Sequence, residues 1–229
     1  MGHTEQSKPN LLKGLAIRLG LGIPCLVAML FLPAGTLAYW EAWIYLAVIL
    51  IPMTFALIVL YRKAPELLER RMRMREKEAT QRKIINLSLL YFLVVFMLPG
   101  FDKRFGWSNV PVAVVLVGDL IVLLGYCFIL YVFRENQYAS RVVEVDEGQQ
   151  VISTGPYAVV RHPMYLGVTL MYVFSPLALG SYWAMIPALL IIPILVMRIR
   201  NEEEVLSREL AGYPAYTQQI RYRLLPGIW

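Results

Sequence analysis

Cysteine and histidine are scarce in this sequence, and their scarcity argues against two kinds of site. Cys25 and Cys127 are the two cysteines, and both lie inside apolar runs, so we expect ordinary packing residues rather than a disulfide framework. The two histidines, His3 and His162, form no HxxxH spacing, and no CxxC is present. We therefore expect no metal centre.

Charged residues are also few, at 17%, whereas hydrophobic residues make up 58% of the 229 positions. Soluble domains contain about 45–50% apolar residues, so this composition predicts an integral membrane protein. The formal net charge is +6. Because Lys and Arg cluster beside the apolar runs, we interpret this charge by membrane topology and expect no nucleic-acid partner. The first ten residues, MGHTEQSKPN, are polar and predict neither a cleaved signal nor a lipid anchor.

Six apolar runs predict the fold. Crossing a hydrocarbon core of about 30 Å takes roughly 20 helical residues, and four of the runs are that long. The last two are shorter and are joined at Gly180-Ser181, so we expect a hairpin that does not fully cross the bilayer. We predict an all-α polytopic membrane helix bundle of about five to six spans, with a small cytoplasmic cap and C-terminal helices. The runs are Leu15–Leu37, Trp43–Tyr61, Ile84–Gly100, Val110–Phe133, Met164–Leu179 and Trp183–Met197.

Residues 61–83 are dense in Arg and Lys, which predicts that this loop is cytoplasmic. Counting spans from it places the N-terminus, residues 134–161 and residues 198–229 on the same side. We interpret the basic loop as a topology anchor with some affinity for anionic lipid, and assign it no catalytic role. We divide the chain into N-terminal membrane helices (1–133) and a core with a helical hairpin and a cytoplasmic tail (134–229).

Two polar stretches of this core contain candidate site residues. Residues 142–153 alternate with period two around Gly148, which predicts a small β-hairpin acting as a lid or positioning element. After it, Pro163 suits the first position of a helix with His162 at its cap. Free N–H groups at this helix end, beside Arg161 and His162, could hold an anion. From physics alone, an equally good reading is that Arg161 reaches lipid headgroups and His162 caps the helix.

The second stretch is RIRNEEEVL, where the last apolar run becomes acidic. Helical spacing places Glu203 on an apolar stripe with Ile199, Leu206 and Leu210, where an acid needs a partner. On charge alone, a solvated face with Arg198 paired to an acid four residues on is the favoured reading. Gly212 and Pro214 predict the end of the helix. Asp119 lies inside the fourth apolar run, and a functional role and a pairing with a neighbouring helix are equally good readings.

At RHPMYLG (161–167) and RIRNEE (198–203) the chain resembles the isoprenylcysteine carboxyl methyltransferase family, and more broadly the integral-membrane methyltransferases that include phospholipid N-methyltransferases. The resemblance runs from about Glu135 through Gly155-Pro156-Tyr157 to Tyr213, Tyr216 and Pro226. The N-terminal half contributes only its hydropathy, so the resemblance implies that the catalytic, cofactor-binding core is residues 134–229.

The resemblance implies S-adenosylmethionine as cofactor, and no G-x-G-x-x-G motif follows a predicted strand to hold it. Its carboxylate would suit the helix end at Pro163 with Arg161 or His162, and its ammonium and sulfonium would suit Glu202 or Glu203. Tyrosine rings could flank the adenine. Arg198 would orient a carboxylate acceptor. The candidate catalytic residues are thus Arg198 and Glu203, and the candidate cofactor-binding residues are Tyr157, Arg161, His162, Pro163, Tyr165, Glu202, Glu203 and Tyr213.

We therefore predict a membrane methyltransferase that methylates the carboxylate of a lipid-like or prenylated, prenylcysteine-like acceptor at the cytoplasmic face. A phospholipid N-methyltransferase is the first alternative, and it would need a glutamate as base. An NADPH-dependent sterol-type reductase shares a similar RHPxY segment but is disfavoured by Gly167-Val168, where those enzymes resemble Gly-Glu. A non-catalytic membrane scaffold or transporter component is the third alternative.

Overall fold

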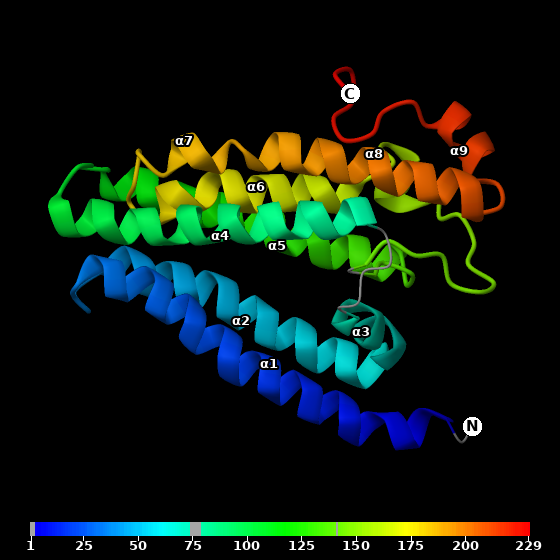
Figure 1. Ribbon diagram of the computed structural model, residues 1–229, viewed down its shortest axis with the longest axis horizontal. Helices are drawn as coiled ribbons and strands as arrows, with labels where there is room; N and C mark the ends of the chain where they lie inside the picture. Colours follow the sequence, from blue (N-terminus) through cyan, green and yellow to red (C-terminus); the bar gives the residue numbers. More distant parts are fainter. Residues whose placement is uncertain (1–2, 74–78, 141) are drawn as a thin grey trace.

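The computed structural model describes residues 3–73, 79–140 and 142–229, and these residues contain helices but no strand. Long helices run side by side along one axis (Figure 1). The elements in chain order are α1 (His3–Ala34), α2 (Trp40–Lys63), α3 (Pro65–Met72), α4 (Ala79–Phe105), α5 (Val112–Glu135), η1 (Gly155–Ala158), α6 (Pro163–Ala178), α7 (Met185–Ala188), α8 (Ile191–Glu209) and α9 (Tyr213–Gln219).

Four helices are long and apolar enough to cross a membrane: Leu11–Ala34, Trp40–Lys63, Lys83–Phe105 and Val112–Glu135. They match the four long runs predicted above. Helix α6 is apolar but has 16 residues, or about 24 Å at 1.5 Å per residue, which is short of the hydrocarbon core. It forms a hairpin with α7 and α8, and the chain turns between them at Gly180, whose φ is +71°. The all-helical fold is confirmed.

Apolar side chains on the outer surface of these helices are widely exposed, as expected of helices that face lipid. Leu32 is 75% exposed, Leu21 and Ile51 are each 69% exposed, and Phe55 is 65% exposed. In water, such side chains on neighbouring helices would be costly to leave uncovered. Their exposure therefore places the bundle in a bilayer.

Close backbone contact fixes α6 against α5. A Cβ atom on Gly167 would lie 2.6 Å from a side-chain carbon of Ile129 and 2.8 Å from the carbonyl oxygen of Gly125. A Cβ atom on Gly125 would lie 2.9 Å from the carbonyl oxygen of Gly167. Only glycine fits at either position, and small residues allow this approach between membrane helices. The contact holds the first turns of α6, which carry site residues, at a fixed depth.

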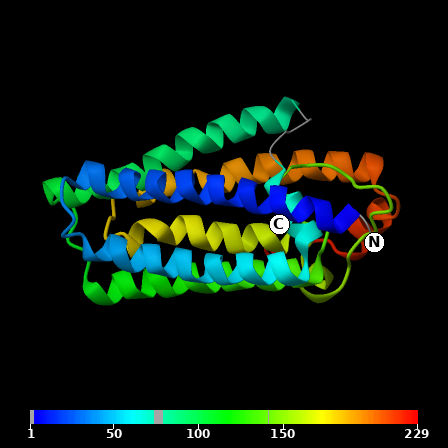
Figure 2. The same ribbon diagram turned by 90° about the horizontal axis from the view of Figure 1, so that it is seen from below.

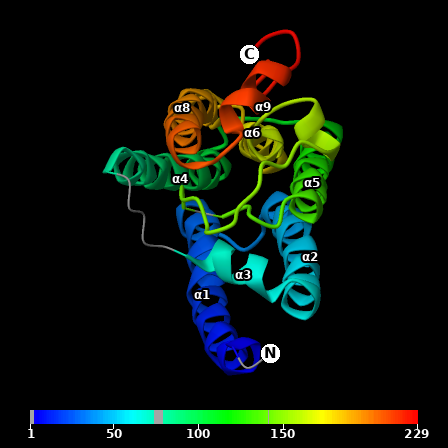
Figure 3. The same ribbon diagram turned by 90° about the vertical axis from the view of Figure 1, so that its right-hand side faces the viewer.

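The polar parts of the chain gather at one end of the bundle. The N-terminus, α3 and α9 lie at this end in two perpendicular views, and α7 lies at the other (Figures 1 and 2). Viewed from the polar end, α3 and α9 stand on opposite sides of the segment that links α5 to α6 (Figure 3). The predicted convergence of the polar stretches is therefore present. Of the basic loop 61–83, residues 74–78 lie outside the described residues.

The predicted β-hairpin at residues 142–153 is wrong. The turn itself exists, because Gly148 has a φ of +73° and the N–H of Gln149 donates to the carbonyl of Asp146 at 3.1 Å, but no strand flanks it in the described chain. Within this segment, the carboxylates of Glu144 and Asp146 pair instead with arginines at the end of α3 and just after it, with Asp146 2.6 Å from Arg70 Nε and 2.8 Å from Arg73 Nη1. These side-chain contacts, and the N–H of Asp146 that donates to the side-chain oxygen of Gln149 at 3.0 Å, hold the segment without strand pairing.

Candidate functional site

A pocket opens at the polar end of the bundle, between α6, α8, α9 and the segment 136–152 that follows α5. Its volume is about 800 Å³, including space that opens to solvent. The lining residues are Asn136, Tyr138, Ala139, Ser140, Val142, Val143, Glu144, Gln149, Gln150, Val151, Ile152, Tyr157, Arg161, His162, Met164, Tyr165, Glu202, Leu206, Leu210, Tyr213 and Tyr216.

Tyrosine rings form much of the pocket surface, and one hydroxyl is unsatisfied. Tyr213 is 4% exposed, and its hydroxyl oxygen has no hydrogen-bond partner among the described residues. Leaving a buried polar group unpaired costs about 1–3 kcal/mol, so this hydroxyl points to a ligand with a polar atom. Burial also raises the pKa of Tyr157 to about 12, which keeps its hydroxyl protonated at neutral pH.

Two hydrogen bonds hold Tyr157 in place. Its hydroxyl accepts a hydrogen bond from the side-chain amide of Asn136 at 2.9 Å, and its carbonyl accepts one from the hydroxyl of Tyr216 at 2.8 Å. These bonds tie η1 both to the end of α5 and to α9. The ring of Tyr157 is therefore fixed at the pocket wall before any ligand enters.

One acid of the EE pair, Glu202, lines the pocket. The hydroxyl of Tyr165 donates to Glu202 Oε2 at 2.6 Å, and Arg198 Nε donates to the same hydroxyl at 2.8 Å. Arg198 also donates from Nη1 to Gln81 Oε1 at 3.2 Å, which links the group to α4. Tyr165 thus stands between a guanidinium and a carboxylate. This arrangement presents negative charge to the pocket with Arg198 set behind it.

The other acid, Glu203, faces basic groups instead of the pocket. Its Oε1 lies 2.7 Å from Arg161 Nε and 3.3 Å from His162 Nε2, and its Oε2 accepts from Arg223 Nε at 2.7 Å. Burial alone would raise the pKa of Glu203, but hydrogen bonds from His162 and Arg223 and the charge of Arg161 lower it to about 2. The partner that the sequence required for this acid is a cluster of three basic side chains.

Arg161 is buried, and this contradicts the headgroup interpretation. Its Nη1 donates to the carbonyls of Thr217 and Ile220, both at 3.2 Å, at the C-terminal end of α9. Its Nε makes no hydrogen bond, so the 2.7 Å contact with Glu203 is ionic. A cation at a helix C-terminus satisfies carbonyls that lack intrahelical partners. Arg161 therefore fixes α9, and Tyr213 with it, against α6 and α8.

Helix α6 begins where the sequence predicts, but the predicted cap and free N–H groups at its start are not both present. The helix begins at Pro163 after His162, but the His162 side chain makes no capping hydrogen bond. The N–H of Tyr165 donates to the carbonyl of His162 at 3.1 Å, so this group is not free for an anion as predicted. His162 itself lines the pocket, and its N–H donates to the carbonyl of Arg223 at 2.9 Å.

The structure brings six of the predicted site residues together in the pocket lining: Tyr157, Arg161, His162, Tyr165, Glu202 and Tyr213. Pro163, Arg198 and Glu203 do not belong to the lining of the described pocket. Sequence reasoning missed Tyr138 and its neighbours in 136–140. It did single out residues 142–153 by their period-two alternation, and seven residues of that segment line the pocket although it forms no strand.

Comparison with known proteins bears on this same region. Residues 113–211 match the model of the phospholipid methyltransferase family. This part of the chain is similar to phospholipid methyltransferases. The match extends from the start of α5 to just beyond α8 and includes Tyr157, Glu202 and Glu203, so it supports a membrane methyltransferase. It does not distinguish a phospholipid acceptor from a carboxylate acceptor. A search of curated proteins found no match.

Proposed function

We propose that this protein is an S-adenosylmethionine-dependent methyltransferase that acts in the membrane on an amphipathic, lipid-like acceptor. The proposal rests on the tyrosine-rich pocket, most of whose lining residues lie within the region similar to the phospholipid methyltransferase family, and on the unpaired hydroxyl of Tyr213 just after that region. In this proposal the pocket holds the cofactor. Following the positive-inside rule, its open end faces the cytoplasm.

The residues present suit the chemical groups of this cofactor. Rings such as Tyr157 offer flat surfaces for adenine, and the Tyr213 hydroxyl can pair with a polar ligand atom. Glu202 would hold the positive end of the cofactor, because it lines the pocket whereas Glu203 already has three basic partners. The carboxylate end would lie near His162 at the start of α6. Glu203 then acts by holding Arg161 and His162 in position.

The cofactor supplies a methyl group on a positively charged sulfur. Transfer of that group needs an acceptor atom in line and a site free of competing water, and the protein contributes both through alignment and enclosure. Tyr165 and Glu202 hold one side of the pocket, and Arg198 stands behind Tyr165 where the apolar part of α8 ends. A lipid entering from the bilayer would reach this depth with its polar head.

For the acceptor we propose a carboxylate, such as that of a prenylcysteine-like molecule. Arg198 can orient a carboxylate with its planar guanidinium, and an ionised carboxylate needs no base before methylation. The phospholipid amine is the second candidate, favoured by the family match. An amine must lose a proton before it attacks, and in that case Glu202, which lines the pocket beside Tyr165, would accept it.

Two measurements on the purified protein test this proposal. Calorimetric titration should give one-to-one binding of S-adenosylmethionine and none of NADPH, and Tyr213→Phe should weaken that binding about fivefold or more through loss of one hydrogen bond. Methyl transfer should then be compared on a carboxylate lipid and an amine lipid of equal chain length. Transfer to the amine alone would replace the carboxylate proposal, and binding of NADPH alone would overturn the methyltransferase proposal.

A further inference from the structure

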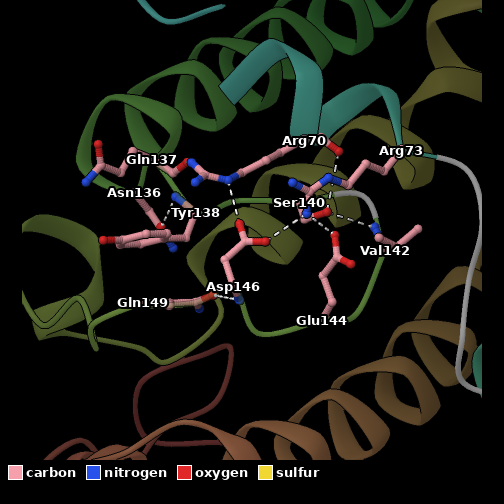
Figure 4. A network of polar contacts seen from close by, with 10 residues as sticks. All are labelled: Arg70, Arg73, Asn136, Gln137, Tyr138, Ser140, Val142, Glu144, Asp146 and Gln149. Atoms are coloured by element: carbon pink, nitrogen blue, oxygen red, sulfur yellow. Dashed lines mark hydrogen bonds and ion pairs between the residues drawn. The ribbon is translucent and has the colours of Figure 1, made fainter. Parts of the chain in front are cut away.

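Helix α3 lies outside the region that matches the methyltransferase family, yet its arginines reach the pocket wall. Arg70, Arg71 and Arg73, at the end of α3 and just after it, contact the segment 136–152, which contributes about half of the pocket lining. We call Arg70 and Arg73, together with Glu144 and Asp146, the α3 clasp. Figure 4 shows Arg70 and Arg73 reaching from the α3 side toward Asp146, with Glu144 on the same segment as Asp146.

Arg70 holds the segment at two points. Its Nε forms an ion pair with Asp146 Oδ2 at 2.6 Å, and its Nη1 donates to the carbonyl of Gln137 at 2.8 Å. Its guanidinium also lies 5.3 Å from the centre of the Tyr138 ring. Arginine suits this task because its planar fork can bond several groups at once while it stacks on a ring.

Arg73 completes the clasp. Its Nη1 contacts Glu144 Oε1 and, at 2.8 Å, Asp146 Oδ1, so Asp146 bridges two arginines. Burial opposes ionisation of Asp146, but hydrogen bonds from Arg73 and Arg70 outweigh it and lower the pKa of this carboxyl. Asp146 is therefore charged at neutral pH, and its ion pairs persist until the pH falls below its ordinary range.

The clasp is continuous with the pocket surface. Glu144 belongs both to the clasp and to the lining. The N–H of Asp146 donates to the side-chain oxygen of Gln149, at 3.0 Å, and Gln149 also lines the pocket. Tyr138, whose ring Arg70 contacts, is a second lining residue that touches a member of the clasp. A movement of Asp146 away from α3 therefore moves the wall itself.

Helix α3 is a firm support for this wall. Leu67 and Leu68 are each 3% exposed, and Arg18 of α1 donates to the carbonyl of Met72 at 2.6 Å. The ion pairs of the clasp are less enclosed, with side chains between 15% and 38% exposed. Partly exposed ion pairs weaken as ionic strength rises. The clasp thus combines a rigid base with bonds that can open.

We propose that the α3 clasp closes the outer wall of the cofactor pocket, and that its ion pairs must break before the cofactor leaves. Arg70, Arg73 and Asp146 are positioning residues in this account, and they act through Tyr138, Glu144 and Gln149. The inference rests on the proposed function, because it takes S-adenosylmethionine as the occupant. It gives the basic residues after α2 a role beyond anchoring topology.

The test measures the dissociation rate of S-adenosylmethionine from the full-length protein in lipid nanodiscs. Asp146→Asn should raise this rate about tenfold at low salt, since hydrogen bonds to charged groups are lost. Added salt should raise the wild-type rate toward that of the variant and change the variant little. Arg73→Glu alone should also raise the dissociation rate. Combining it with Glu144→Arg, which exchanges the two charges, should bring the rate most of the way back to that of wild type.

Arg208→Gln is the matched control, because neither residue of the Arg208–Glu209 ion pair belongs to the pocket lining and their side chains are 62% and 43% exposed. It should leave the dissociation rate unchanged. A rate for Asp146→Asn within twofold of wild type, with the same salt dependence, would overturn the clasp. If the wild type binds no S-adenosylmethionine, the proposed function fails. Proteolysis of the ligand-free protein then tests whether the α3 clasp holds the segment 136–152 in place. Asp146→Asn should speed cleavage within 136–152 in the ligand-free protein, and equal cleavage rates would refute the contact.

Discussion

Replacement of Glu203 by Gln tests the buried charge cluster behind the pocket. Glu203 is 9% exposed and is shared by Arg161, His162 and Arg223. A pKa lowered from 4.5 to about 2 corresponds to about 3 kcal/mol in favour of the ionised form, at about 1.36 kcal/mol per pH unit. The Arg223 side chain is 35% exposed, so solvent screens part of this, which leaves about 2 kcal/mol for the loss in Glu203→Gln.

Thermal unfolding in detergent micelles measures this loss. For a chain of this size we expect the unfolding midpoint to fall by roughly 4–8 °C at pH 7, at about 2–4 °C per kcal/mol. Because the pKa of Glu203 is lowered on folding, its contribution is fully present above about pH 4.5 and is lost as the pH falls toward 2. The unfolding midpoints of wild type and Glu203→Gln should therefore converge as the pH falls toward 2.

Glu202→Gln provides the control, because Glu202 is the neighbouring acid and accepts a hydrogen bond from Tyr165 that glutamine can also accept. Its midpoint should stay within about 2 °C of wild type. An unchanged midpoint in Glu203→Gln at pH 7 would refute the reasoning. So would a difference from wild type that persists unchanged at pH 2.

Three further predictions concern single side chains. Arg198→Lys should lower turnover on a carboxylate lipid at least tenfold while cofactor affinity in calorimetry stays within twofold, and full turnover would exclude the guanidinium as the acceptor's partner. Tyr157→Ala should weaken cofactor binding about tenfold, because it removes a fixed ring, whereas Tyr157→Phe should retain most of it. Asp119→Leu should leave unfolding stability equal or higher, since both carboxylate oxygens of Asp119 are buried without a partner among the described residues. A loss above about 2 kcal/mol in Asp119→Leu would show an interaction that these contacts omit.

The membrane helices could be predicted from the sequence because their length and apolarity follow directly from the bilayer. The run Trp43–Tyr61 lies within α2, for example, and Val110–Phe133 nearly coincides with α5. Helix ends were also readable where special residues stand, as at Pro163. Both signals are local and need no knowledge of the tertiary fold.

The contacts of the site could not be predicted in this way. Arg161 was expected at headgroups or at an anion, yet it bonds the carbonyls of Thr217 and Ile220, which lie more than 50 positions away. The alternating segment near Gly148 was interpreted as a hairpin because the partners of Glu144 and Asp146, Arg70 and Arg73, are more than 70 residues distant in sequence. Which of Glu202 and Glu203 faces the pocket also depends on these long-range contacts, since both lie on one helix turn.

The most direct test of the central claim is ultraviolet cross-linking of methyl-labelled S-adenosylmethionine to the protein, followed by mapping of the labelled peptides. A cofactor held in the pocket should label peptides that contain Tyr157 or Tyr213, and excess unlabelled cofactor should remove the label. Label confined to peptides outside the pocket, or no label that competes, would contradict the account.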